Sequence, residues 1–284
     1  MGRNVKVRRI SGTLGAEIEG VDLARPLPES AIAELRALWL EHLVLFFRDQ
    51  ALAPRQFLAL ARSFGEAVEY PFLKGLADAP EVVEVLKREH ETVNFGGVWH
   101  SDTAYLECPP MATMLIAREI PPHGGDTMFA NGYLAYEALP EGLRERLKLL
   151  RAVNSSAKAD VSRTREDRLR EKGSDDAGLE FTAEHPVARI HPETGRAALY
   201  VNPAHTVRFA GMTEEESAPL LDDLFRHQVR PEFTSRFAWS PGAIALWDNR
   251  CTLHFPVNDY HGHRRLMHRV TLAGDVPRGY SDLK

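Results

Sequence analysis

The sequence predicts a mainly β protein with helical decoration, of the β-sandwich or jelly-roll type. Many short apolar segments of strand length are separated by turn residues, and amphipathic helical patterns occur only at intervals between them. This order differs from the regular alternation of strands and helices that marks a parallel α/β sheet. With 284 residues, of which 44% are hydrophobic and 26% charged, the chain is able to bury a core. We therefore expect one domain over residues 1–284.

The N-terminal part of the chain combines strands with two helices. Residues 5–18 alternate in the manner of strands and end at the turn Gly20-Val21-Asp22. Pro28-Glu29-Ser30 starts an amphipathic helix, and residues 54–64 form a second helix that Gly65 ends. Further strands are predicted at residues 43–47, 82–86 and 111–117.

The C-terminal part is richer in strands. Residues 135–150 are helical with an interruption near Pro140, and Thr213 with Glu216 forms a capping box that starts a helix reaching about His227. Strands are predicted at residues 187–190, 198–201, 233–239, 243–247 and 266–273, the first two forming a hairpin. Residues 157–178 contain many charges and few large apolar side chains, so we expect a mobile surface segment that acts as a lid.

Composition excludes several classes of function. The formal net charge of −5 gives no positive field to attract nucleic acid or an anionic membrane surface. No apolar stretch reaches membrane-spanning length, and no secretory signal is recognisable at the N-terminus, which favours a cytoplasmic protein. Cys108 and Cys251 do not form a CxxC pair, and we expect both to be buried small hydrophobes.

The first chemical cluster is Trp99-His100-Ser101-Asp102. On an extended strand, residues i and i+2 project from one face, so His100 and Asp102 would reach one point. An imidazole and a carboxylate at one point provide two of the three ligands of a facial metal site, whose third ligand is a distant His. Taken alone, a His-x-Asp pair is more often a surface or capping pair.

The second cluster lies near the C-terminus, where Trp247-Asp248-Asn249-Arg250 leads to His254. Arg265 follows on a returning strand, and a planar guanidinium binds a carboxylate with two parallel hydrogen bonds. Between the two clusters, Gly124-Gly125-Asp126-Thr127 places a hydroxyl after a turn, although it could equally be only a hairpin turn. Together these residues suit a metal site beside an anchor for a carboxylate.

Three segments taken together resemble the motifs of the taurine dioxygenase family, which includes aryloxyalkanoate dioxygenases and alkylsulfatases. They are Asn94 to Asp102, Gly124 to Thr127, and Trp247 to Arg269, and the resemblance extends from about Val5 to Pro277. It implies a double-stranded β-helix of the clavaminate synthase-like type that uses Fe(II), 2-oxoglutarate and O₂. By the same resemblance, His100, Asp102 and His254 ligate iron, and Thr127 and Arg265 bind the C5 carboxylate of 2-oxoglutarate.

The resemblance also places the substrate. Arg269 matches an arginine that holds the sulfonate of taurine in that family, and its spacing from Arg265 puts both side chains on one face of a strand. The remaining positions at the substrate differ from those of taurine dioxygenase: they are Tyr70, Leu73, Gly96 and His205. We therefore expect a small anionic organic substrate other than taurine. A structural salt bridge of Arg269 inside the barrel is the alternative.

Two other functions fit part of the pattern. A zinc hydrolase would use two histidines and a carboxylate, but it has no need of Thr127 and Arg265. A non-catalytic β-sandwich binding protein would have no need to keep all three ligands in order. The resemblance further implies a homodimer or homotetramer.

Overall fold

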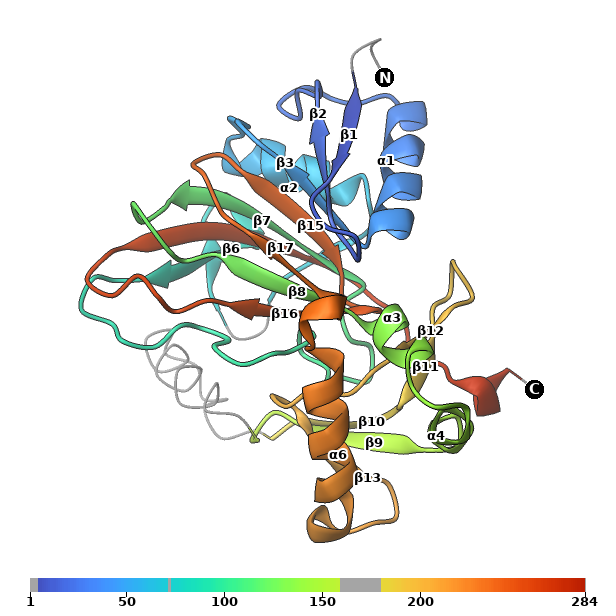
Figure 1. Cartoon of the computed structure of the whole chain (residues 1–284). Coiled ribbons are helices and arrows are strands. Elements are labelled where there is room, and N and C mark those ends of the chain that lie inside the picture. The colour runs from blue at the N-terminus through green and yellow to red at the C-terminus, as the bar shows by residue number, and fades with distance from the viewer. Residues whose placement is uncertain (1–4, 71–72, 159–179, 284) are drawn as a thin grey trace.

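The computed structural model of the chain describes residues 5–70, 73–158 and 180–283 (Figure 1). The largest sheet in these ranges runs in the order β1-β2-β3-β15-β7-β17-β6-β5, and β4 also pairs with β17. Its neighbouring strands are antiparallel except for β2 and β3, which are parallel. The strands are β1 (Lys6–Arg9), β2 (Ala16–Glu19), β3 (Val44–Phe47), β4 (Ala67–Val68), β5 (Gly75–Leu76), β6 (Ala79–Lys87), β7 (Ala112–Glu119), β15 (Ile244–Asp248) and β17 (Arg265–Leu272).

Three smaller sheets complete the β structure of the described residues. One, in the order β14-β8-β16, faces the large sheet, and the other two have the orders β10-β9-β13 and β11-β12. The strands are β8 (Thr127–Asn131), β9 (Arg151–Ser155), β10 (Thr182–Pro186), β11 (Ala188–Ile190), β12 (Ala197–Leu199), β13 (Thr206–Phe209), β14 (Thr234–Phe237) and β16 (Thr252–Pro256).

The helices cover the outside of the sheets. Helices α1 (Glu29–His42) and α2 (Pro54–Arg62) pack on the large sheet, whereas α6 (Glu214–Gln228) packs on β13 and on α3 (Gly132–Glu137) (Figure 1). The remaining helical segments are α4 (Glu141–Leu147) and the 3-10 turns η1 (Pro231–Phe233) and η2 (Tyr280–Asp282). The predicted capping box is confirmed, because Thr213 and Glu216 each accept a backbone N–H of the other at the start of α6.

The central strands of the large sheet, β3, β15, β7 and β17, are largely buried on both faces. In β15, Ile244 and Leu246 join the core under α1 and α2, whereas Ala245 and Trp247 face the core that also contains Phe129 of β8. This follows from the two-residue repeat of a strand, and it explains why the segment is apolar throughout. The inner face of the large sheet and the sheet β14-β8-β16 therefore form the two walls of a jelly roll.

Most of the predicted elements are confirmed, including the interruption of a helix near Pro140 and the hairpin of β11 and β12. The prediction missed β8 and β16, the two short strands that carry Thr127 and His254, and also β9, β10 and β13. It was wrong on Cys108, which is exposed, and right on Cys251, which is buried.

The predicted lid at residues 157–178 lies outside the described residues, apart from its first two positions. Among the residues that the structure describes, none of the helices combines the length and the apolar character needed to cross a bilayer. A single domain over residues 1–284 stays a prediction.

Candidate active site

A cavity opens between the two walls of the jelly roll. Two of its ten lining residues are arginines and none is acidic, so a negatively charged ligand is favoured there. The lining residues are Val85, Phe95, His100, Leu115, Thr127, Trp247, His254, Pro256, Arg265 and Arg269. They come from both walls and from the loop between β6 and β7.

His100, Asp102 and His254 converge at this cavity. Asp102 Oδ1 lies 3.7 Å from His100 Nε2 and 3.8 Å from His254 Nε2, and the two imidazole centroids are 4.0 Å apart. The backbones of the two histidines also pair, with N···O distances of 3.1 and 2.8 Å. The predicted extended strand from His100 to Asp102 is wrong. Only His100 forms a β-bridge, whereas Asp102 lies in a turn with Thr103 at a φ of 39°.

Both imidazoles present Nε2 to the shared point. His100 Nδ1 lies 2.6 Å from the carbonyl oxygen of Val98, which only accepts, so Nδ1 carries the proton and Nε2 keeps its lone pair. Burial lowers the pKa of His100, and burial together with the nearby His100 holds the pKa of His254 well below its usual value. Neutral histidines with exposed lone pairs are the form that binds metal ions.

Asp102 is ionised, and neighbouring side chains contact its Oδ2 atom. Burial alone would raise the pKa of its carboxyl, but the nearby groups, Arg269 foremost, outweigh burial and hold the pKa well below its usual range. Asp102 Oδ2 accepts a hydrogen bond from Thr113 Oγ1 at 2.5 Å and lies 3.1 Å from Arg269 Nη2. The sequence gives no indication of Thr113, which is the second residue of the ordinary apolar strand β7.

These three residues fit a divalent metal ion. Their ligand atoms, two imidazole nitrogens and one carboxylate oxygen, all lie within 4.8 Å of one another. Two histidines and one carboxylate on one side of an ion leave its other positions open to small molecules, as in the facial triad of non-haem Fe(II) oxygenases.

Arg265 and Thr127 form a second polar group in the same cavity. Arg265 is 6% exposed, and its Nε and Nη2 have no hydrogen-bond partner in the described part of the chain. Thr127 Oγ1 accepts from Trp239 Nε1 at 3.0 Å, so its own proton is available for donation. A buried guanidinium edge without partners, in the same cavity as a hydroxyl donor, fits a carboxylate of a ligand.

Gly96 has a local structural role. Its φ is +74°, and a Cβ added there would lie 2.8 Å from His100 Cε1. A glycine is therefore required for the loop to pass close to the imidazole.

Arg269 lies over the ring of Tyr70, with Cζ 4.6 Å from the ring centroid. Tyr70 belongs to an apolar cluster that also contains Tyr105 and against which Leu73 packs. His205 lies there too, its ring centroid 4.9 Å from that of Tyr105 and 6.1 Å from that of His100. Tyr70, Gly96 and His205 thus lie near Arg269 or His100, whereas Leu73 packs on the cluster of Tyr70. None of the four is among the residues that line the cavity.

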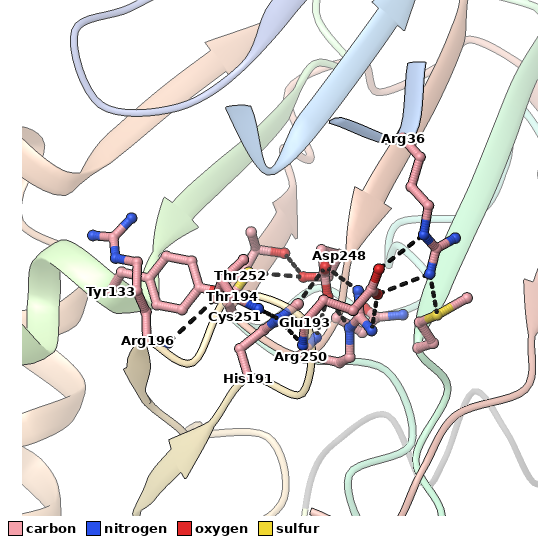
Figure 2. Close-up of polar contacts among 12 residues, drawn as sticks. Arg36, Tyr133, His191, Glu193, Thr194, Arg196, Asp248, Arg250, Cys251 and Thr252 are labelled. Carbon is pink, nitrogen blue, oxygen red and sulfur yellow. Dashed lines mark hydrogen bonds and ion pairs between the residues drawn. The ribbon is translucent and has the colours of Figure 1, made fainter. Parts of the chain in front are cut away.

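A second group of potential metal ligands, His191, Asp248 and Cys251, is also close together (Figure 2). His191 Nδ1 accepts the backbone N–H groups of Glu193 and Thr194, so its Nε2–H donates to Asp248 Oδ2 at 3.0 Å. Burial raises the pKa of the Cys251 thiol well above its usual value, which keeps it protonated. With no lone pair of His191 left over and no thiolate, this group does not fit a metal ion.

Asp248 of this group also begins an ionic chain that is buried at Asp248 and Arg250 and that fixes the loop before β16. Asp248 holds the guanidinium of Arg250 through both carboxylate oxygens, at 2.8 and 2.7 Å. Arg250 continues to Glu193 at 2.8 Å, and Glu193 binds Arg36 of α1 through two further contacts of 2.8 Å (Figure 2). These ion pairs join α1, the β11–β12 hairpin and the loop that leads to His254, so their role is to position the loop.

The family model described as "Taurine catabolism dioxygenase TauD, TfdA family" matches residues 6–271. This chain belongs to that family. It is 34% identical over 289 residues to an alkylsulfatase of Acinetobacter baylyi, covering 99% of this chain and 89% of that protein. It is 35% identical over 281 residues to an alpha-ketoglutarate-dependent sulfate ester dioxygenase of Pseudomonas putida, covering 96% of this chain and 91% of that protein.

The structure is similar to a crystal structure of a taurine dioxygenase from Burkholderia xenovorans, with a TM-score of 0.83 and 37% sequence identity. The similarity covers 98% of this chain and 94% of that chain. The predicted TauD/TfdA membership, the jelly-roll fold and the class of 2-oxoglutarate-dependent dioxygenase are confirmed.

Proposed function

We propose that this TauD/TfdA-family protein is an Fe(II)-dependent enzyme that couples decarboxylation of 2-oxoglutarate to oxidation of a small organic anion other than taurine. His100, Asp102 and His254 would hold the iron, which supplies the activation of O₂ when bound. The protein supplies the binding, orientation and exclusion of water that this chemistry requires.

The observation that carries the proposal is the pair of unpartnered buried nitrogens of Arg265 in the cavity that also contains both histidines. An unpaired cation in a dry site destabilises the ligand-free protein, and a bound carboxylate would remove that cost. Thr127, at the start of β8 on the facing wall, would donate to the same carboxylate. A dicarboxylate with a 2-oxo group at its other end would thus extend from Arg265 to the metal.

The alternative of a zinc hydrolase is less well supported. Activation of a metal-bound water requires the two histidines and Asp102 only. It gives no role to the buried Nε and Nη2 of Arg265, which have no hydrogen-bond partner in the described residues. The relatives named above are described as an alkylsulfatase and a sulfate ester dioxygenase, and the second of these names includes dependence on alpha-ketoglutarate.

For the substrate we propose an anion held by Arg269, with an apolar body against the cluster that contains Tyr70 and Tyr105. Arg269 Nε has no hydrogen-bond partner in the described residues, and its Nη2 approaches Asp102 without hydrogen-bond alignment. The cluster consists of Tyr70, Val83 and Tyr105 with Leu73, Phe95, Leu106 and Phe181 around it. Phe95 of this cluster lines the cavity, and an alkyl sulfate, a longer sulfonate or an aryloxyalkanoate would make more apolar contact there than the two-carbon body of taurine.

The test is succinate formation with Fe(II), 2-oxoglutarate and a panel of sulfates, sulfonates, aryloxyalkanoates and their neutral analogues. We expect the anions to stimulate succinate formation, the neutral analogues to be inactive, and taurine to be poor. Arg269→Ala should abolish stimulation by the anions and leave 2-oxoglutarate binding intact. Equal turnover of anions and neutral analogues would contradict the assignment of Arg269.

We also propose a cytoplasmic protein that forms a homodimer or homotetramer and binds neither nucleic acid nor membranes. Sedimentation equilibrium would measure its oligomeric state, and a monomer at micromolar concentration would contradict that part of the proposal.

A further inference from the structure

The two oxygens of Asp102 have different surroundings. Oδ1 faces the Nε2 atoms of His100 and His254, at 3.7 and 3.8 Å. Oδ2 points the other way, to the hydroxyl of Thr113 at 2.5 Å and to Arg269. The carboxylate is therefore already oriented with one oxygen toward the point where the histidines meet.

The hydroxyl of Thr113 belongs to a chain of hydrogen bonds whose direction is fixed by chemistry at both ends. The indole Nε1–H of Trp247 can only donate, and it donates to Asn249 Oδ1 at 2.9 Å. The amide nitrogen of Asn249 is then directed to Thr113 Oγ1, to which it donates at 3.0 Å. An ionised Asp102 only accepts, so the proton of the Thr113 hydroxyl must point to Asp102 Oδ2.

This chain of hydrogen bonds is buried, and its member Asn249 is anchored by backbone contacts. Trp247, Asn249, Thr113 and Asp102 are between 0% and 3% exposed, so water does not compete for their hydrogen bonds. Asn249 donates its backbone N–H to Met111 at 2.9 Å and accepts at its carbonyl from Ser101 Oγ at 2.7 Å. These contacts tie it to the residue before β7 and to the residue between the two ligands of the His-x-Asp motif.

We propose that Thr113 and Asn249 are positioning residues of the metal site, which hold Asp102 Oδ2 away from the ion so that Oδ1 alone is its ligand. The inference rests on the proposed function. A carboxylate that binds with one oxygen leaves one more position for the other molecules that must bind, and outer hydrogen bonds of this kind contribute to metal affinity. The geometry assigns this work to one hydroxyl, that of Thr113.

A second threonine of the protein provides a matched control for the Thr113 hydroxyl. Thr271 of β17 is paired with Thr113 of β7 in the sheet register and is 4% exposed, but its hydroxyl has no hydrogen-bond partner among the described residues. Replacing either threonine by valine changes the same atoms in adjacent buried positions. Only the Thr113 replacement removes a contact to Asp102.

The experiment measures the dissociation constant of Co(II) for the full-length metal-free protein, without 2-oxoglutarate, together with the melting temperature of the metal-free form. We expect Thr113→Val to weaken Co(II) binding by about 10- to 100-fold, Thr113→Ser to restore it to within about threefold of the wild type, and Thr271→Val to have no effect. If Thr113→Val does not fold, Thr113→Ala compared with Thr113→Ser isolates the same hydroxyl. A purely structural threonine would lower the melting temperature and leave Co(II) binding unchanged.

The outcomes separate this inference from the proposed function. Wild-type affinity in Thr113→Val, or an equal loss in Thr271→Val, overturns the positioning role while leaving the metal site in place. Failure of the wild-type protein to bind Co(II), or binding that survives removal of His254, overturns the proposed function as well.

Discussion

Replacing Arg265 by methionine should weaken 2-oxoglutarate binding without destabilising the ligand-free protein. Arg265 is 6% exposed and its Nε and Nη2 have no partners in the described residues, so the whole hydrogen-bonding capacity of that edge of the guanidinium is available to the ligand. Removing one partner of a buried charge pair costs about 2–5 kcal/mol. Because 1.4 kcal/mol corresponds to a factor of ten, the dissociation constant of 2-oxoglutarate should rise by at least about thirtyfold.

The same replacement should leave the free energy of unfolding of the ligand-free protein unchanged or higher. Burial lowers the pKa of Arg265, which means that the cation is unfavourably placed until a carboxylate arrives. Methionine fills much of the volume of the arginine stem and carries no charge into the cavity. An arginine that served only the fold would show the opposite result, a loss of stability on replacement.

Isothermal titration of 2-oxoglutarate into protein loaded with Mn(II), which avoids turnover, measures the binding, and urea unfolding of the metal-free protein measures the stability. The control is Arg264→Met, because Arg264 is adjacent in sequence but 41% exposed in its side chain, with its Nε 2.8 Å from Glu119. Wild-type binding in Arg265→Met, or a loss of several kcal/mol of stability in its ligand-free form, would contradict the role of Arg265 as the anchor of 2-oxoglutarate.

Three further predictions concern other parts of the structure. Thr127→Val should weaken 2-oxoglutarate binding by about 1.5–3 kcal/mol, the value of a hydrogen bond to a charged group, as the same titration would show. Arg250→Ala leaves Asp248 buried without its cation and should lower the free energy of unfolding in urea by about 3–5 kcal/mol, whereas the exposed Arg226→Ala should change it little. Burial lowers the pKa of His185 from 6.5 to about 4, so this residue contributes a stability that is present above pH 6.5 and is lost as the pH falls toward 4. Between pH 7 and pH 4, the free energy of unfolding in urea should therefore fall by about 3 kcal/mol less in His185→Gln than in the wild type. Equal decreases would exclude His185 as the source of this pH dependence.

The part of the site that depends on local periodicity could be predicted from the sequence. Arg265 and Arg269 are four residues apart on one strand, so both were expected on the same face, and both line the cavity. The alternation that places Trp247 in the inner core has the same origin. These features follow from the two-residue repeat of a single strand and do not depend on which strands pair.

The part that depends on distant contacts could not be predicted. His100 and Asp102 were expected at one point, but what brings them there is the backbone pairing of His100 with His254, far along the chain, and a turn at Thr103 instead of a strand. Thr113 and Asn249 are separated by 136 positions, and their hydrogen bond exists because β7 and β15 are neighbours in the sheet. Nothing in the local sequence distinguishes Thr113 from Thr271, although only the first contacts a residue of the triad.

The most direct test of the proposed function is an anaerobic titration of Fe(II) into the metal-free protein in the presence of 2-oxoglutarate, followed by visible absorption. The proposed function predicts a weak charge-transfer band that saturates at one iron per chain and is absent from Asp102→Ala and from His254→Ala. It also predicts that adding an anionic substrate perturbs the band. A wild-type protein that gives no band, or an equal band in the His254→Ala protein, would contradict the assignment of iron and 2-oxoglutarate to this cavity.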